Sequence, residues 1–208
     1  MSDEQMLVET NEWATAEHAN AYLQRAHLMP RRDAGYDELR ALVPPTPRRV
    51  LDLGTGDGKV LDLIGAPGVG IDFSPAMLDA ARTRFAGRPD VEIVDHNFNA
   101  ALPDVGSFDV VVSAFAIHHC SHDRKRALYA EVFERLEPGG VFANLEHVSS
   151  PTDRLHKEFL ALVGAPEDPS NQLLDVETQL GWLRAIGFVE VDCFWKWREL
   201  ALLSGVKP

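Results

Sequence analysis

Three glycines in one short segment can bring a ligand against the main chain. The segment Val50–Val60 is an apolar run that contains an acid, Asp52, and continues as Gly-x-Gly-x-Gly through Gly54, Gly56 and Gly58. Glycine takes backbone conformations that other residues rarely adopt, and it lets a ligand approach closely. In α/β folds such a turn joins a parallel strand to a helix beside a bound nucleotide. The segment therefore predicts a loop that cradles a nucleotide-like cofactor.

The spacing of these glycines disfavours two common nucleotide motifs. The dinucleotide fingerprint G-x-G-x-x-G requires glycine where this chain has Lys59. The phosphate-binding loop ends in Gly-Lys-Ser/Thr, but Val60 follows Lys59 and has no hydroxyl for a magnesium ion. A nicotinamide dehydrogenase is therefore disfavoured, and a tight turn at any βα junction is the plain alternative.

A second acid is predicted at the end of the next strand. Gly68–Asp72 has the pattern of a short strand, and Ser74 with Pro75 is typical of a helix start. Ligands bind at the carboxyl edge of open α/β sheets, where the Asp72 carboxylate can accept hydrogen bonds from both hydroxyls of a ribose. Phe73 is placed to cover an adenine ring. A helix-capping or solvent-facing role for Asp72 is the alternative.

The segment Asp52–Gly58 and Asp72 resemble the first two motifs of the class I S-adenosylmethionine-dependent methyltransferases. Three later segments resemble, in order, that family's third strand with its adenine-contacting loop, its fourth strand, and the turn before its fifth strand: Val91–Asn99, Ser107–His119 and Leu136–Phe142. Five motifs in the right order over residues 50–148 make the resemblance specific. It implies a methyltransferase with S-adenosylmethionine as its cofactor.

The resemblance also implies the fold. We expect an α/β protein with a Rossmann-like, doubly wound, seven-stranded sheet that is mostly parallel, has an antiparallel last strand, and carries helices on both faces. Residues 1–208 are expected to form a single domain. Within it we expect an N-terminal helical lid over 1–45, a cofactor-binding core over 46–148, and C-terminal helices and closing strands over 149–208.

The family's cofactor residues carry over position by position. The resemblance implies that the methionine part is surrounded by Asp52, Gly54, Thr55 and Gly56, that Asp72 holds the ribose, and that adenine is surrounded by Phe73, Asn97 and Phe98, with Met77 and Ala114 also in the cofactor site. One position departs from the family, which often has an acid where this chain has Asn97. Asparagine can still accept a hydrogen bond from the adenine amino group. Asp95 and Asn97 are therefore left as alternatives for that contact.

The chemistry implied by the resemblance is direct displacement of the sulfonium's methyl group, for which the protein mainly supplies proximity and alignment. A base is needed only if the acceptor arrives protonated. Histidine suits that task, and His118 is the first candidate, with His119 beside it and Glu146 and His147 at the end of the fifth strand. A role in shaping the pocket or capping the helix is the alternative for both His118 and His119.

A metal site is not predicted. His118 and His122 are four residues apart and can share a helical face, with His119, Cys120 and Asp123 nearby. These residues do not form a closed set of ligands at a known spacing.

Composition limits the range of partners. The chain has 208 residues, an apolar fraction of 45% and a formal net charge of −12. This charge disfavours binding to a nucleic-acid backbone, and no apolar run is long enough to span a membrane. The N-terminus lacks a signal-peptide pattern, so a cytoplasmic location is expected. The two cysteines are far apart in sequence and lack the spacing of a zinc site or a disulfide framework. We expect a small-molecule acceptor, neither nucleic acid nor membrane as a partner, and leave a homodimer open.

Outside the motifs, periodicity predicts the remaining elements. Helices are expected over Trp13–Met29, Asp33–Val43, Asp123–Leu136, Asp153–Val163 and Val176–Ile186, and closing strands over Phe188–Cys193 and Phe194–Leu203. By resemblance, the first two helices form the lid, from which Tyr22, Arg25 and Arg32 can reach the cofactor or acceptor. Trp195 and Trp197 on the last strand are expected to pack in a central strand, with an aromatic wall for the acceptor as the alternative.

Two other functions stay open at this stage. An enzyme of the same fold can remodel the S-adenosylmethionine sulfonium with a second metabolite. The chain can also be a non-catalytic adenosyl-ligand-binding partner protein, which would bind without turnover and expose an apolar patch.

Overall fold

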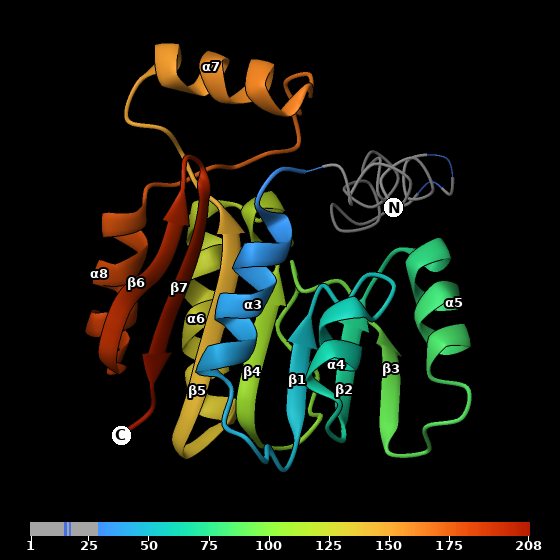
Figure 1. Cartoon of the computed structure of the whole chain (residues 1–208). Helices are drawn as coiled ribbons and strands as arrows, with labels where there is room; N and C mark the ends of the chain where they lie inside the picture. Colours follow the sequence, from blue (N-terminus) through green and yellow to red (C-terminus); the bar gives the residue numbers. More distant parts are fainter. Residues whose placement is uncertain (1–14, 16, 18–28) are drawn as a thin grey trace.

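The computed structural model describes residues 15, 17 and 29–208, and its centre is a seven-stranded sheet (Figure 1). The strands lie in the order β3-β2-β1-β4-β5-β7-β6. Pairing is parallel from β3 to β5, and β7 runs antiparallel to both β5 and β6. The bounds are β1 Val50–Leu53, β2 Gly68–Asp72, β3 Val91–Asp95, β4 Phe108–Ala114, β5 Leu136–His147, β6 Val189–Trp197 and β7 Leu200–Val206. The predicted doubly wound sheet with a reversed last strand is confirmed.

The strand order places a ligand crevice between β1 and β4. From β1 the chain winds outward through β2 to β3, then returns to place β4 against the other edge of β1. The loops after β1 and β4 therefore leave the sheet in opposite directions and open a gap at the carboxyl edge, which is the upper edge in Figure 1. Ligands of open α/β sheets bind at this switch point.

Helices cover both faces of the sheet. Packing against the sheet places α3 (Arg32–Leu42) and α4 (Lys59–Ile64) on one face, and α6 (His122–Arg135) and α8 (Val176–Ile186) on the other. Helix α5 (Pro75–Arg84) runs along β3, and the short 3-10 helix η3 (Ile117–His119) follows β4. Helix α7 (Asp153–Val163) lies beyond the carboxyl edge, above the sheet in Figure 1. The helices on the two faces do not cover the carboxyl edge, so the loops there can form a ligand site.

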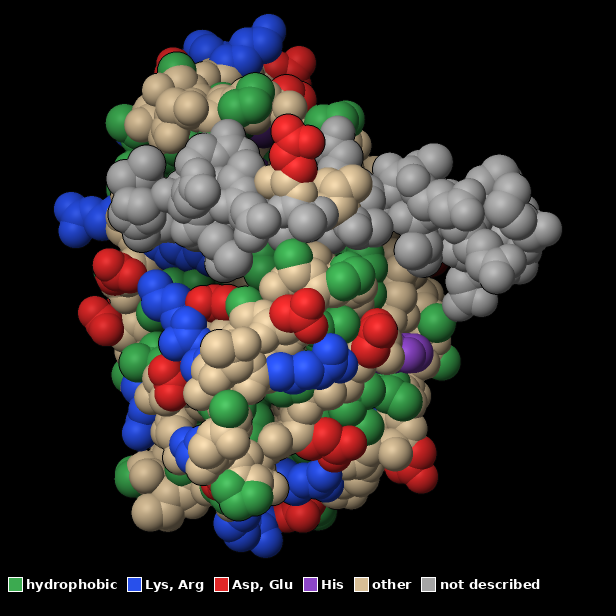
Figure 2. All heavy atoms as spheres, turned by 90° about the vertical axis from the view of Figure 1, so that its right-hand side faces the viewer, with side chains coloured by type: hydrophobic (Ala, Val, Ile, Leu, Met, Phe, Trp, Pro, Cys, Tyr) green, Lys and Arg blue, Asp and Glu red, His purple; other side chains and the backbone are tan. Residues whose placement is uncertain are grey.

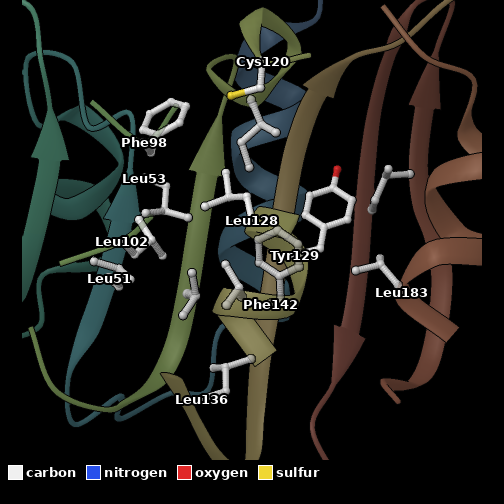
Figure 3. Packing of buried hydrophobic residues seen from close by; sticks show 14 of the residues in the cluster. Leu51, Leu53, Phe98, Leu102, Cys120, Leu128, Tyr129, Leu136, Phe142 and Leu183 are labelled. Atoms are coloured by element: carbon white, nitrogen blue, oxygen red, sulfur yellow. The ribbon is translucent and has the colours of Figure 1, made fainter. Parts of the chain in front are cut away.

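Two apolar clusters on opposite faces hold these layers together. Alternation along β1 sends Leu51 and Leu53 to the face of α6, where they join Leu128, Tyr129 and Phe142 (Figure 3). On the other face, α3 and α4 contribute the buried side chains of Tyr36, Leu39, Val60, Leu61 and Ile64. Each large apolar side chain buried in this way contributes about 1.5–3 kcal/mol. The two clusters fix the sheet between its helices and hold the carboxyl-edge loops in place.

Several predicted helices have the expected bounds. Helix α3 begins and ends one residue before the predicted Asp33–Val43, and α7 and α8 match their predicted ranges. Ser121 caps α6 by accepting a hydrogen bond from the amide of Arg124, so this helix begins one residue before the predicted Asp123 and ends one residue before the predicted Leu136. Ser74 occupies the predicted cap position of α5, but no side-chain hydrogen bond caps that helix. Most of the predicted Trp13–Met29 helix, including Tyr22 and Arg25, lies outside the described residues, so the lid stays a prediction.

The prediction for the two closing strands was wrong in its bounds. Strand β6 continues through Trp197, and the hairpin turns at Arg198 and Glu199, where Arg198 has a φ of 54°. Consequently Trp195 and Trp197 belong to β6 rather than to the last strand, and β6 is an edge strand rather than a central one. Trp195 contacts α3 near Gly35, and Trp197 meets the ring of Phe159 in α7. The predicted bounds missed the turn because the apolar alternation continues across Phe194.

Candidate functional site

A cavity of about 200 Å³ lies at the switch point of the sheet. Its walls come from the loops that follow β1, β2, β3 and β4, together with the first turn of α3. All the predicted cofactor residues except Asp52 line it: Gly54, Thr55, Gly56, Asp72, Phe73, Met77, Asn97, Phe98 and Ala114. Of the two predicted histidines, His119 lines the cavity and His118 does not. Trp195 and Trp197 are also absent from its walls.

The loop after β1 is fixed by close packing and by a charged contact. Gly54 has a φ of 71°, and a Cβ added there would lie 2.2 Å from the Cβ of Ala116. Gly58 similarly lies against the ring of Phe85, where an added Cβ would be 2.5 Å from Cε2. The Arg84 guanidinium donates to the Asp57 carbonyl at 2.7 Å and pairs with its carboxylate at 2.5 Å. The glycine loop is thereby held open toward the cavity.

The Asp72 carboxylate organises two loops. Its Oδ2 accepts the amide of Gly56 at 2.9 Å, and its Oδ1 accepts the amides of Phe73 and Ser74 at 2.8 and 2.9 Å. Burial raises the pKa of Asp72, and these backbone hydrogen bonds act in the opposite direction. A carboxylate offers about four acceptor positions, so Asp72 can still receive a ligand hydroxyl in the cavity. This charge fits a hydroxyl-rich sugar and repels a phosphate.

Asp52 lies behind the cavity wall. Its Oδ2 accepts the hydroxyl of Thr55 at 2.8 Å, and its Oδ1 is buried without a hydrogen-bond partner among the described residues. Burial raises the pKa of Asp52 to about 7. Of the two candidates for the adenine contact, Asn97 lines the cavity and Asp95 is exposed outside it.

Aromatic and cationic side chains form the wall on the α3 side. The rings of Tyr36 and Phe115 meet edge to face with centroids 6.2 Å apart. The Arg32 guanidinium lies over both rings, 4.8 Å from the Phe115 centroid, and its Nε donates to the Tyr36 hydroxyl at 2.9 Å. Lys59 lies 4.4 Å from the Tyr36 centroid. Phe115 has a φ of 56°, a strained value that turns its ring into the cavity wall.

The two histidines after β4 occupy different environments although they are neighbours in sequence. Both belong to the short 3-10 helix η3, which precedes α6. His118 is buried, and its Nδ1 lies 2.7 Å from Oε1 of Glu146, so a proton lies between the two atoms. Burial lowers the pKa of His118 well below its usual value and raises the pKa of Glu146 to about 7. His118 therefore belongs to a buried pair behind the cavity wall.

His119 faces the cavity from the same turn. Burial is the main cause that lowers the pKa of His119 to about 3, and the nearby His118 is the second. The neutral imidazole is therefore the form present near neutral pH. Its Nδ1 lies 3.0 Å from the hydroxyl of Ser170, in the loop between α7 and α8. Cys120 also lines the cavity, and burial raises the pKa of its thiol to about 12.

A buried lysine ties this turn to the loop between α7 and α8. The ammonium of Lys125 donates to the carbonyls of Cys120 at 2.7 Å and His118 at 3.3 Å, and also to that of Gln172. The amide of Gln172 donates back to the His118 carbonyl at 2.8 Å. Sequence reasoning missed Arg84, Lys125 and Ser170, because they lie outside the motifs and only the fold brings them to the site.

The surface near α5 carries charges of both signs. Figure 2 shows basic and acidic side chains interspersed below the grey, undescribed residues. Ion pairs on this side include Arg84 with Asp62 at 3.2 Å and Arg88 with Asp90 at 2.8 Å. Within the described residues, His, Cys, Asp and Glu form no group of three or more that could hold a metal ion. The helices described include none that could cross a membrane.

The fold is a doubly wound α/β sheet with a cavity at its switch point, where ligands of such sheets bind. The chain belongs to the S-adenosylmethionine-dependent methyltransferase family, class I. The family model described as a methyltransferase domain matches residues 50–140. A demethylmenaquinone methyltransferase from Clavibacter sepedonicus is 32% identical over 196 residues, which cover 81% of this chain and 77% of that protein.

Solved structures share the fold. An O-methyltransferase family protein from Burkholderia thailandensis superposes with a TM-score of 0.73 at 21% identity, over 94% of this chain and 61% of that one. Human N-acetylserotonin methyltransferase, solved in complex with S-adenosylmethionine, has a TM-score of 0.68 at 16% identity, over 94% of this chain and 57% of that one. S-adenosylmethionine, the cofactor that the sequence predicts for this chain, is bound in the second of these structures.

Proposed function

We propose that this methyltransferase transfers the methyl group directly to a small aromatic acceptor that carries a hydroxyl group. One observation carries the proposal: the cavity that holds the predicted cofactor residues also contains the Tyr36 and Phe115 rings and the His119 imidazole. Aromatic rings favour an aromatic ligand by edge-to-face or offset stacking. The 32% identical relative is named for demethylmenaquinone, which supports a ring-bearing acceptor.

The predicted residues fit an adenosyl cofactor in this cavity. Asp72 would accept hydrogen bonds from the ribose hydroxyls, and Phe73 and Phe98 would flank adenine. Asn97 would accept a hydrogen bond from the amino group of adenine. Gly54 and Gly56 line the cavity without side chains, so the backbone there leaves room for the methionine part. When bound, S-adenosylmethionine supplies a methyl group on a sulfonium, which a nucleophile takes by displacement.

The residues around the acceptor position align it and receive its proton. His119 is neutral near physiological pH and lines the cavity, so it is the proposed proton acceptor in place of His118, which lies behind the wall against Glu146. The Cys120 thiol stays protonated, because burial raises its pKa to about 12, so it does not relay the methyl group. Arg32, which lies over the aromatic pair, would stabilise an acceptor oxygen as its negative charge develops.

The test is transfer of a radiolabelled methyl group from S-adenosylmethionine to a panel of phenols, catechols and naphthohydroquinone. We expect label on at least one acceptor and a fall in kcat of at least about 100-fold in His119→Asn, with near-normal binding of S-adenosylhomocysteine. His122→Asn, which changes an exposed histidine on α6, is the matched control. The proposal is wrong if wild-type protein labels no aromatic acceptor, or if cofactor carried through purification has the mass of a remodelled sulfonium.

A further inference from the structure

Three side chains from two distant parts of the chain form a hydrogen-bonded series that ends at the cavity. The hydroxyl of Ser170 lies 2.7 Å from Oδ1 of Asp168 and 3.0 Å from Nδ1 of His119. The Ser170 amide also donates to Oδ1 of Asp168 at 2.8 Å. Asp168 and Ser170 are in the loop between α7 and α8, whereas His119 ends η3 after β4.

The positions of the protons in this series follow from which of its groups can donate a hydrogen bond. A serine hydroxyl has a single proton, and an ionised carboxylate can only accept. Partial burial alone would raise the pKa of Asp168, but the two hydrogen bonds from Ser170 act in the opposite direction, and that pKa is lowered. Asp168 is therefore ionised, and the Ser170 proton lies toward it. The Ser170 oxygen can then only accept from His119, which requires the proton of the neutral imidazole to be on Nδ1.

The loop that carries Ser170 is held in place independently of this series. Lys125 joins the Gln172 carbonyl to the carbonyls of η3, and the Gln172 amide donates to the His118 carbonyl at 2.8 Å. The Asn171 amide also bonds the Asp168 carbonyl at 3.1 Å, which closes a turn around Ser170. Ser170 is thus fixed relative to η3 on both sides.

We infer that Ser170 and Asp168 are positioning residues that hold His119 in its Nδ1–H tautomer, so that Nε2 carries the lone pair that accepts the acceptor's proton. The inference rests on the proposed function for the role of His119. In the reaction, the O–H bond of the acceptor breaks as its oxygen, or the ring carbon conjugated to it, bonds to the methyl carbon. When the ring carbon attacks, the product is first a ketone, and the hydrogen on that carbon then leaves as a proton while the oxygen takes one up, which restores the aromatic ring. The proton goes to Nε2, the S–CH₃ electron pair stays on sulfur, and the imidazolium later loses its extra proton to solvent.

The Asp168 carboxylate also acts on the charge that His119 gains in the reaction. The imidazolium is disfavoured by burial, but the Asp168 charge acts in the opposite direction. A positive charge formed on His119 during transfer is therefore offset through Ser170 by an ionised carboxylate. In this arrangement His119 is the base, and Ser170 with Asp168 sets its orientation and tautomer.

The deciding experiment is long-range proton–nitrogen NMR of the imidazole rings in the S-adenosylhomocysteine complex, which needs no acceptor. His119→Gln assigns the His119 signals among the 8 histidines of the chain. We expect a pyrrole-type shift for Nδ1 and a pyridine-type shift for Nε2 in the wild type. Ser170→Ala should shift the population toward the other tautomer, Ser170→Thr should restore it, and Ser107→Ala, which changes an exposed serine before β4, should leave it unchanged.

Kinetics separate positioning from structure. With the acceptor that turns over best in the panel, Ser170→Ala and Asp168→Asn should lower kcat about tenfold or more while KM and cofactor affinity stay within about twofold. A proton on Nε2 in the wild type, or a tautomer that does not respond to Ser170→Ala, overturns the inference. Failure of the proposed function would appear differently, as absent turnover by the wild type with the expected NMR spectrum.

Discussion

The close contact between Gly54 and Ala116 makes a quantitative prediction about the cofactor loop. Gly54→Ala introduces two separate costs. The first is the left-handed backbone, φ 71°, which costs an alanine about 1–2 kcal/mol. The second is the collision of the new Cβ with the Ala116 Cβ at 2.2 Å, and overpacking of this kind costs about 1–3 kcal/mol. We expect Gly54→Ala to lower the free energy of unfolding by about 2–5 kcal/mol.

Gly139→Ala is the matched control, because it has a similar φ of 78° but no atom within 4 Å of the added Cβ. It should cost only the backbone term, about 1–2 kcal/mol. Adding Ala116→Gly to Gly54→Ala removes the colliding methyl group and should restore most of the difference between these two variants. The assay is urea unfolding followed by circular dichroism, with the slope m as a check on two-state behaviour.

The same variants test the cofactor loop. If the backbone shifts to relieve the collision, the loop no longer presents Gly54 and Gly56 to the ligand, and affinity for S-adenosylhomocysteine should fall at least about tenfold by calorimetry, which is about 1.4 kcal/mol. Gly139→Ala should bind normally. Equal stabilities for Gly54→Ala and Gly139→Ala, or no recovery in the double variant, would refute the steric account.

Three further predictions concern ionisable side chains. Asp72→Ala should retain the fold by circular dichroism but lose about tenfold or more in cofactor affinity by calorimetry, since it removes a charged acceptor; normal affinity would rule out the ribose role. Burial raises the pKa of Glu146 from 4.5 to about 7, so the folded state favours the protonated carboxyl. The stabilisation that this proton gives is complete below pH 4.5 and is lost as the pH rises through 7. Gln cannot ionise, so the stability of Glu146→Gln relative to wild type should increase by about 3 kcal/mol between about pH 4.5 and pH 8 in urea unfolding, and a constant difference would contradict this. Arg84→Ala, which releases Asp57, should weaken cofactor binding by no more than about fivefold because the pair is partly exposed, and a larger loss would show that the loop depends on it.

The parallel core of the fold was predictable because local signals agree with one another. The run Val50–Leu53, the glycine turn after it and the acid that ends Gly68–Asp72 each predict the same βα unit. The bounds of α7 and α8 followed from apolar periodicity and, for α8, from Gly187 after its last residue; the structure adds Gly164 as the C-cap of α7. The closing hairpin was misplaced because the turn at Arg198 has no glycine or proline to mark it.

The arrangement of the candidate site was less predictable. His118 and His119 are adjacent, and only the path of η3 decides that His119 faces the cavity while His118 pairs with Glu146. The choice between Asp95 and Asn97 likewise depends on where β3 ends. Ser170 is about fifty residues from His119 in sequence, in a loop without a motif, so its contact is a property of the tertiary structure alone.

The loop between α7 and α8 reaches His119 from a part of the sequence that lies well after the cofactor motifs. The cofactor loops and His119 all lie within residues 50–140, the range that the family model matches, whereas the loop with Asp168 and Ser170 lies after it. The segment proposed to bind the cofactor and the segment proposed to set the tautomer of His119 are therefore separate in the sequence. Exchange of residues 164–175 alone offers a route to retune proton transfer while the cofactor loops keep their sequence.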